Sequence, residues 1–182
     1  MGLGGRPFTI SIFVGKVSEV VPYDFHDPES SLVGQVYNFT SPDEGETRCD
    51  NCAEQARNKT LASGRVVLTN SLITRWKQQL VHHPDPGVDG PTVLASMDPH
   101  DVVPFLTANL HWRITAGGHR VDPADVPSVK VCAVVGKAEH FADLGKLSKY
   151  HDYVPAYQVT AGKPAGAGPE DHLYPEGVEW QP

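Results

Sequence analysis

Apolar and polar residues alternate with a period of two along several short segments of the chain. In residues 8–15, Phe8, Ile10, Ile12 and Val14 share one face and Thr9 and Ser11 the other, and Gly15 ends the pattern. This alternation predicts a half-buried β-strand. Further strands are predicted at 32–39, at 110–114, in a more fully buried form at 129–136, and last at 157–160, and a short extended segment is predicted at 65–68.

Two stretches between these strands have helical spacing instead. Thr69 or Asn70 can cap a helix that runs to Leu80, and Asp98 can cap a second helix whose first residue is Pro99. Pro104 is expected to limit this second helix to a turn or two. The fold class predicted is therefore mainly β, an antiparallel β-sandwich with one or two short helices in a crossover.

The length of 182 residues is that of one ordinary domain, which buries roughly 70% of its unfolded surface. We expect a leader at 1–7, a sandwich domain at 8–162, and a tail at 163–182. Because this tail is rich in glycine and proline, it is expected to be a frayed or extended arm.

The net charge of the chain limits the classes of partner that it is expected to bind. Fifteen basic and 22 acidic residues give a net charge of −7, with no basic cluster. This charge argues against nucleic acid or an anionic membrane as a partner, and no apolar run reaches the roughly 18 residues of a membrane-spanning helix. The first seven residues lack the apolar segment of a signal peptide, so a cytoplasmic location is expected. The first predicted strand lies so close to Met1 that the natural chain is expected to have continued upstream.

Cys49 and Cys52 form the sharpest local motif. Two thiols three positions apart can bind one soft ion such as Cu(I), or close a small disulfide. A structural zinc site needs four ligands, and no second pair is present. Cys132 lies in an apolar segment and is interpreted as a core residue. A copper-binding pair, a loop-closing disulfide, a redox pair and two idle thiols all remain open.

The nine histidines do not form a metal-binding pattern, because none lies three or four residues from another. The glycine-rich, nucleophile-elbow and zinc-protease motifs are also absent. The chain is therefore not expected to be an enzyme on its own. Tyr37 and Phe39 alternate on one predicted strand just before a turn. They either pack on the sheet or present an aromatic ring to the pocket of a partner.

A set of short segments occurs in an order and spacing that resembles the C-terminal domain of fungal tyrosinases. The segments are FTISIFVG at 8–15, VGQVYNF at 33–39, CDNC at 49–52, VLTN at 67–70, VVPFL at 102–106 and LHWR at 110–113. The resemblance covers about residues 8–162. It implies a β-sandwich similar to the third domain of molluscan haemocyanin.

The resemblance also implies a role. In this family the domain follows a catalytic domain with a dicopper centre, which oxidises phenols as a monophenol monooxygenase or catechol oxidase (polyphenol oxidase) in melanin biosynthesis. The domain covers the active site of the latent proenzyme with an inserted aromatic residue. Phe39 is the candidate for that blocking residue and Tyr37 is the second choice. Cys49 and Cys52 match a pair that hands copper, as transient Cu(I), to the centre.

The expected partner is thus a tyrosinase catalytic domain, in cis or in trans. Two other classes stay open beside this interpretation. One is a stand-alone metal-binding or redox protein, and the other is a purely structural β-sandwich.

Overall fold

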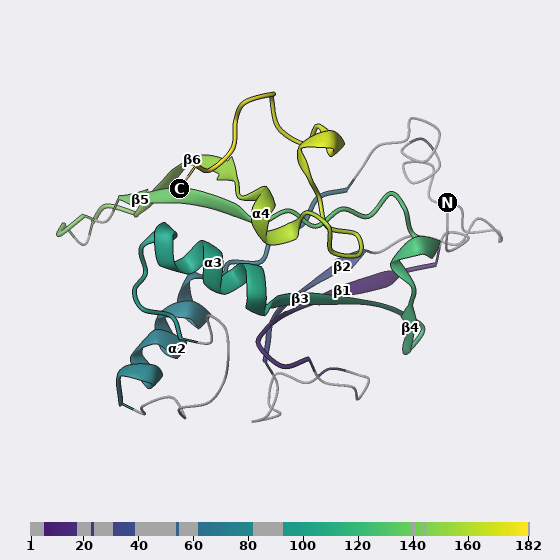
Figure 1. Cartoon of the computed structure of the whole chain (residues 1–182), viewed down its shortest axis with the longest axis horizontal. Coiled ribbons are helices and arrows are strands. Elements are labelled where there is room, and N and C mark those ends of the chain that lie inside the picture. The colour runs from purple at the N-terminus through teal and green to yellow at the C-terminus, as the bar shows by residue number, and fades with distance from the viewer. Residues whose placement is uncertain are drawn as a thin grey trace.

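The computed structural model describes residues 6–17, 23, 31–38, 54, 62–81, 93–139, 141–143 and 145–181. Figure 1 shows two antiparallel sheets with helices beside them. In the described part of the chain, no helix has both the length and the apolar character needed to cross a membrane.

The larger sheet has four strands in the order β2-β1-β3-β4, with bounds Leu32–Asn38, Phe8–Val14, Leu110–Ala116 and His119–Val121. Its neighbouring strands are all antiparallel, and β1 and β3 are the two inner strands. β3 and β4 are joined by Gly117 and Gly118, which both have positive φ, 57° and 79°. A two-residue hairpin of this kind needs that conformation, which glycine adopts at little cost.

The smaller sheet consists of β5 (Val134–Glu139) and β6 (Lys149–Pro155). The prediction of a buried strand over 129–136 was wrong, since the strand begins at Val134 and is largely exposed. The residues that precede β5 pair with the C-terminal segment instead. The N–H of Val131 donates a hydrogen bond of 2.8 Å to the carbonyl of Ala165. β6 escaped prediction because its polar residues do not alternate with apolar ones.

Helices α2 (Thr69–Val81) and α3 (Pro99–Asn109) connect β2 to β3. Asp98 caps α3 as predicted, since its carboxylate accepts a hydrogen bond from the N–H of His100 at 2.9 Å. The expectation that Pro104 would stop this helix was wrong. Pro104 lies on the exposed side, while Val103 and Phe105 beside it are buried and hold the helix in place.

Three shorter helical segments follow: the 3₁₀ turns η1 (Pro123–Asp125) and η2 (Pro169–Asp171), and the one-turn helix α4 (Tyr157–Thr160). The last of these was predicted as a strand, which was wrong. The N–H of Ala161 donates to the carbonyl of Tyr157 at 2.7 Å and closes the helical turn. Val159 and Thr160 are fully buried within it, so packing selects the helix over the local β preference of these residues.

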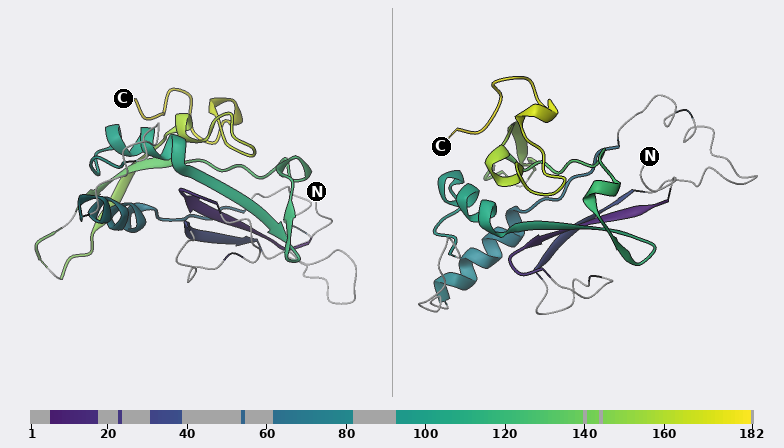
Figure 2. Two further views of the ribbon diagram at one scale, coloured as in Figure 1. Left: turned by 60° about the horizontal axis from the view of Figure 1, so that its bottom comes forward. Right: turned by 45° about the vertical axis from the view of Figure 1, so that its right-hand side comes forward.

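The main hydrophobic core lies on one face of the larger sheet and also receives residues from α3, α4 and the base of the smaller sheet. Its buried members are Ile12, Val14, Leu72, Leu94, Val103, Phe105, Leu106, Leu110, Trp112, Ala156 and Val159. Both views in Figure 2 place α2 and α3 at one end of the larger sheet. The predicted class, mainly β with antiparallel sheets and a few short helices in a sandwich-like arrangement, is confirmed.

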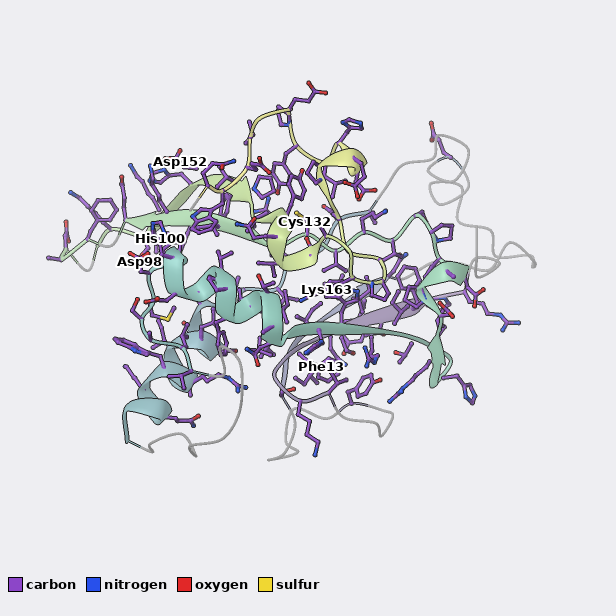
Figure 3. The ribbon with its side chains drawn as sticks, in the orientation of Figure 1. Phe13, Asp98, His100, Cys132, Asp152 and Lys163 are labelled. Atoms are coloured by element: carbon purple, nitrogen blue, oxygen red, sulfur yellow. The ribbon has the colours of Figure 1, made fainter. Side chains whose placement is uncertain are left out.

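The opposite face of the sheet is partly buried as well. Phe13 is fully buried there and contacts the ring of Tyr23 edge-on, with 4.9 Å between ring centroids. In Figure 3, Phe13 lies below the larger sheet and Lys163 above it. The alternation in residues 8–15 did not reveal this second buried cluster, because Phe13 falls on the face that carries Thr9 and Ser11.

The C-terminal segment is folded against the body, so the expectation of a frayed or extended arm was wrong. The indole N–H of Trp112 donates to the carbonyl of Pro164 at 2.7 Å, and the Lys163 ammonium donates to the carbonyl of Leu110 at 2.9 Å. Further along, Ala167 is fully buried, and the N–H of Trp180 donates to the carbonyl of Pro155. These bonds tie the last twenty residues to β3 and β6.

Candidate functional site

Tyr37 lies near the end of β2 and is 55% exposed, the position expected for a displayed aromatic side chain. Its hydroxyl donates a hydrogen bond of 2.6 Å to Oε1 of Gln35. Nε2 of Gln35 in turn donates to Oγ of Ser11 at 3.0 Å, and Ser11 is fully buried. Since residues two apart on a strand share a face, the phenol group of Tyr37 is directed back along β2 toward the middle of the sheet.

A shallow hollow of about 240 Å³ lies beside Tyr37. It is formed where the start of β1, the end of β2 and the β3–β4 turn meet, and its lining includes Phe8, Tyr37, Thr115 and Gly117. Thr9 pairs with Tyr37 on one side and with Thr115 on the other. The backbone around the hollow is thus held by the ladder hydrogen bonds of three strands.

Phe39, Cys49 and Cys52 lie outside the described residues. Of the predicted site residues, only Tyr37 has a described position. The roles assigned to Phe39 as a blocking residue, and to the two cysteines as copper ligands, therefore remain predictions.

Cys132 is half-buried, and its Sγ lies 3.5 Å from the carbonyl oxygen of Ala133. Burial raises the pKa of this thiol to about 11, and the nearby carboxylate of Asp171 adds to the rise. A metal-binding cysteine must lose its proton. The surroundings of Cys132 oppose that loss and so disfavour this thiol as a metal ligand, although Cys132 is half-buried and not a member of the core clusters.

The described histidines are held in separate places. The ring of His100 contacts that of Trp180 with 5.5 Å between centroids. His111 is partly buried, and burial lowers its pKa, helped by the charges of Lys163 and Arg113. Within the described ranges, no three His, Cys, Asp or Glu side chains gather into a set that could hold a metal ion.

Sequence reasoning missed one group of charged side chains, on the smaller sheet. Nε2 of His151 lies 3.3 Å from a Glu139 oxygen, and its Nδ1 lies 3.1 Å from Oδ2 of Asp152. Lys137 also contacts Asp152 at 3.2 Å, and the hydrogen bond from His151, followed by that from Lys137, lowers the pKa of the Asp152 carboxyl. The only sequence signal was the clustering of charges at 137–152, since β6 itself was not predicted.

Comparison with known proteins identifies the family of this chain. The model of the family described as "Tyrosinase C-terminal domain" matches residues 1–133. A tyrosinase of Neurospora crassa is 32% identical over 171 residues, which is 93% of this chain. The match spans about a fifth (22%) of that tyrosinase, and no solved structure matches. The chain therefore belongs to the tyrosinase C-terminal domain family.

Proposed function

We propose that this chain is a non-catalytic domain that covers the dicopper active site of a tyrosinase, a phenol-oxidising enzyme. Its family membership and its similarity to about a fifth of a named tyrosinase support this role. The remaining length of such a relative would supply the partner, and that partner would carry the copper and the oxidation chemistry.

The observation that carries the proposal is the exposed aromatic position at the end of β2. Tyr37 is fixed by the hydrogen bonds that link it through Gln35 to the buried Ser11. A rigid strand end loses little conformational entropy when it enters a partner's pocket. Because the hydroxyl of Tyr37 is turned back along its own strand, the proposal takes Phe39, two positions further on, as the inserted ring and Tyr37 as its neighbour.

The test is inhibition of a fungal tyrosinase catalytic domain by the full 182-residue chain in trans, with a catechol as substrate. The wild-type chain is expected to inhibit at saturation, and Phe39→Ala to weaken inhibition about tenfold or more, as expected when a central aromatic anchor is removed. Leu173→Ala is the control, because Leu173 is an exposed apolar residue of the C-terminal segment. A wild-type chain that fails to inhibit contradicts the covering role, and unchanged inhibition by Phe39→Ala contradicts the choice of blocking residue.

Copper delivery is the second part of the proposal. Two thiolates suit Cu(I), and ligand exchange with imidazoles would release the ion, because both ligand types bind it well. The double variant Cys49→Ser/Cys52→Ser is expected to lower the copper content of a tyrosinase catalytic domain loaded in its presence. Cys132→Ser is the control and should leave loading unchanged. Equal copper content with all three chains would contradict delivery through this pair.

A further inference from the structure

The strands β5 and β6 and the loop between them form a two-stranded unit, here called the β5–β6 ribbon. Several of its apolar side chains are exposed. Val134, Leu147, Tyr150 and Tyr153 are 41%, 91%, 59% and 40% exposed, and they make up half of the large exposed hydrophobic residues in the described part of the chain. Figure 1 shows the ribbon extending to the left edge of the molecule, past α3. Contiguous exposed apolar groups mark interaction sites.

The two faces of the ribbon differ. Tyr150 pairs with Ala138 across the strands, and the ring of Tyr153 lies over Gly136, where an added Cβ would come within 2.6 Å of it. Gly136 and Ala138 are two residues apart, so both tyrosines share one face. Lys137 and Glu139 lie on the other face, opposite His151 and Lys149.

The ribbon is also an incomplete sheet. Within the described residues, β5 has β6 as its one strand neighbour, and five of its six residues are exposed. Two strands alone are marginally stable in water. An exposed strand edge offers backbone donors and acceptors to another strand.

Charge distinguishes this surface from the rest of the molecule. The whole chain carries a net charge of −7, which opposes the association of two copies. The ribbon and its loop are balanced, with three lysines (137, 146 and 149) against Glu139, Asp143 and Asp152. The ribbon itself therefore adds no repulsion when it meets the same surface of a second copy.

We propose that β5 pairs in antiparallel fashion with β5 of a second copy of this chain, with Ala138 at the two-fold axis. This register places Lys137 opposite Glu139 of the second copy, and the same pair forms again on the other side of the axis. A charged edge discourages pairing with unrelated strands. Lys137 and Glu139 are the two charged residues of β5, and this is the register in which each meets the opposite charge of a second copy.

The resulting four-stranded sheet forms a small interface, and the dimer is expected to be weak and dependent on concentration. Sedimentation equilibrium of the full chain, from micromolar to near-millimolar concentration, measures its Kd. Lys137→Glu and Glu139→Lys are each expected to weaken dimerisation tenfold or more, because each sets like charges opposite each other. Lys77→Glu is the matched control, since it makes the same charge change at an exposed position of α2.

Mixing the two variant chains tests whether Lys137 and Glu139 face each other across the dimer in this register. An equimolar mixture of Lys137→Glu and Glu139→Lys chains should restore dimers, because all facing charges are then opposite. Ala138→Cys should form a disulfide between copies on mild oxidation, identified by peptide mapping, whereas Gly145→Cys should not. A wild-type chain that stays monomeric throughout, or an Ala138→Cys chain that forms no such disulfide, overturns the proposal.

Discussion

The indole Nε1–H of Trp112, in the middle of β3, donates a 2.7 Å hydrogen bond to the carbonyl of Pro164, 52 residues later in the chain. The ammonium of Lys163 lies 5.9 Å from the centroid of the same indole ring and donates to the carbonyl of Leu110. One core tryptophan thus joins the larger sheet to the C-terminal segment, as the tail beside β3 in Figure 2 illustrates.

Trp112→Phe is expected to lower the free energy of unfolding by about 1–3 kcal/mol, because the partly buried Pro164 carbonyl loses its donor. Urea denaturation measures the change. Trp76→Phe is the comparison, since the indole of Trp76 donates to the carbonyl of Ala95 at 3.1 Å in an exposed setting. Water can replace the Trp76 donor, so Trp76→Phe should lower the free energy of unfolding by less than Trp112→Phe. Equal losses in the two variants would contradict this account of the tail.

Gly166 approaches the backbone of α4 too closely to carry a side chain. A Cβ built on it would lie 1.8 Å from the carbonyl oxygen of Thr160. Gly166→Ala must therefore displace the C-terminal segment, and the expected loss of stability is about 2 kcal/mol or more. In Gly145→Ala the nearest atom is an Asp143 side-chain oxygen at 3.3 Å, and little change is expected. Comparable melting temperatures for the two variants would show that the segment is not held at this point.

Cys132 should react slowly with thiol reagents in the folded chain. With a pKa of about 11, only about one thiol in a thousand is ionised at pH 8. Iodoacetamide labelling followed by peptide mapping should therefore modify Cys132 at least a hundredfold more slowly in buffer than in denaturant. Labelling at similar rates in both conditions would contradict the raised pKa of this half-buried thiol.

Asp171 should make the free energy of unfolding depend on pH in the acid range. Its carboxylate lies 2.7 Å from the Lys130 ammonium and accepts a hydrogen bond from the N–H of Gly168, and both bonds lower its pKa below 3.8, with Lys130 contributing more. A lowered pKa in the folded state gives stability that is present above about pH 4 and lost as the pH falls through the folded pKa.

Urea denaturation at pH values from 7 to 3 tests this dependence. Asp171→Asn should be less stable than the wild-type chain at pH 7, and the difference should shrink below about pH 4 as Asp171 becomes protonated. Asp125→Asn, on the exposed η1 turn, is the matched control. A difference between Asp171→Asn and wild type that stays constant over the whole range would contradict the ion pair with Lys130.

Local sequence patterns were enough to predict the elements whose conformation depends mainly on their own residues. Ile10, Ile12 and Val14 identify β1, and the Asp98-Pro99 pair marks the start of α3. Strand alternation placed Tyr37 on β2 but left open whether its ring packs on the sheet or is displayed, and the structure shows it exposed. The remaining site residues, Phe39, Cys49 and Cys52, rest on the family pattern alone and stay predictions.

Contacts between distant segments decided the rest. Residues 157–160 have strand-like composition but form a helix, because Val159 is buried in the core that β1 and β3 build. Val131 pairs with Ala165 and Ala167 in the tail instead of joining a sheet. Alternation, turns and helix caps could be predicted from the sequence, since they depend on neighbouring residues. Which segments are buried became known from the fold, because burial depends on partners far away along the chain.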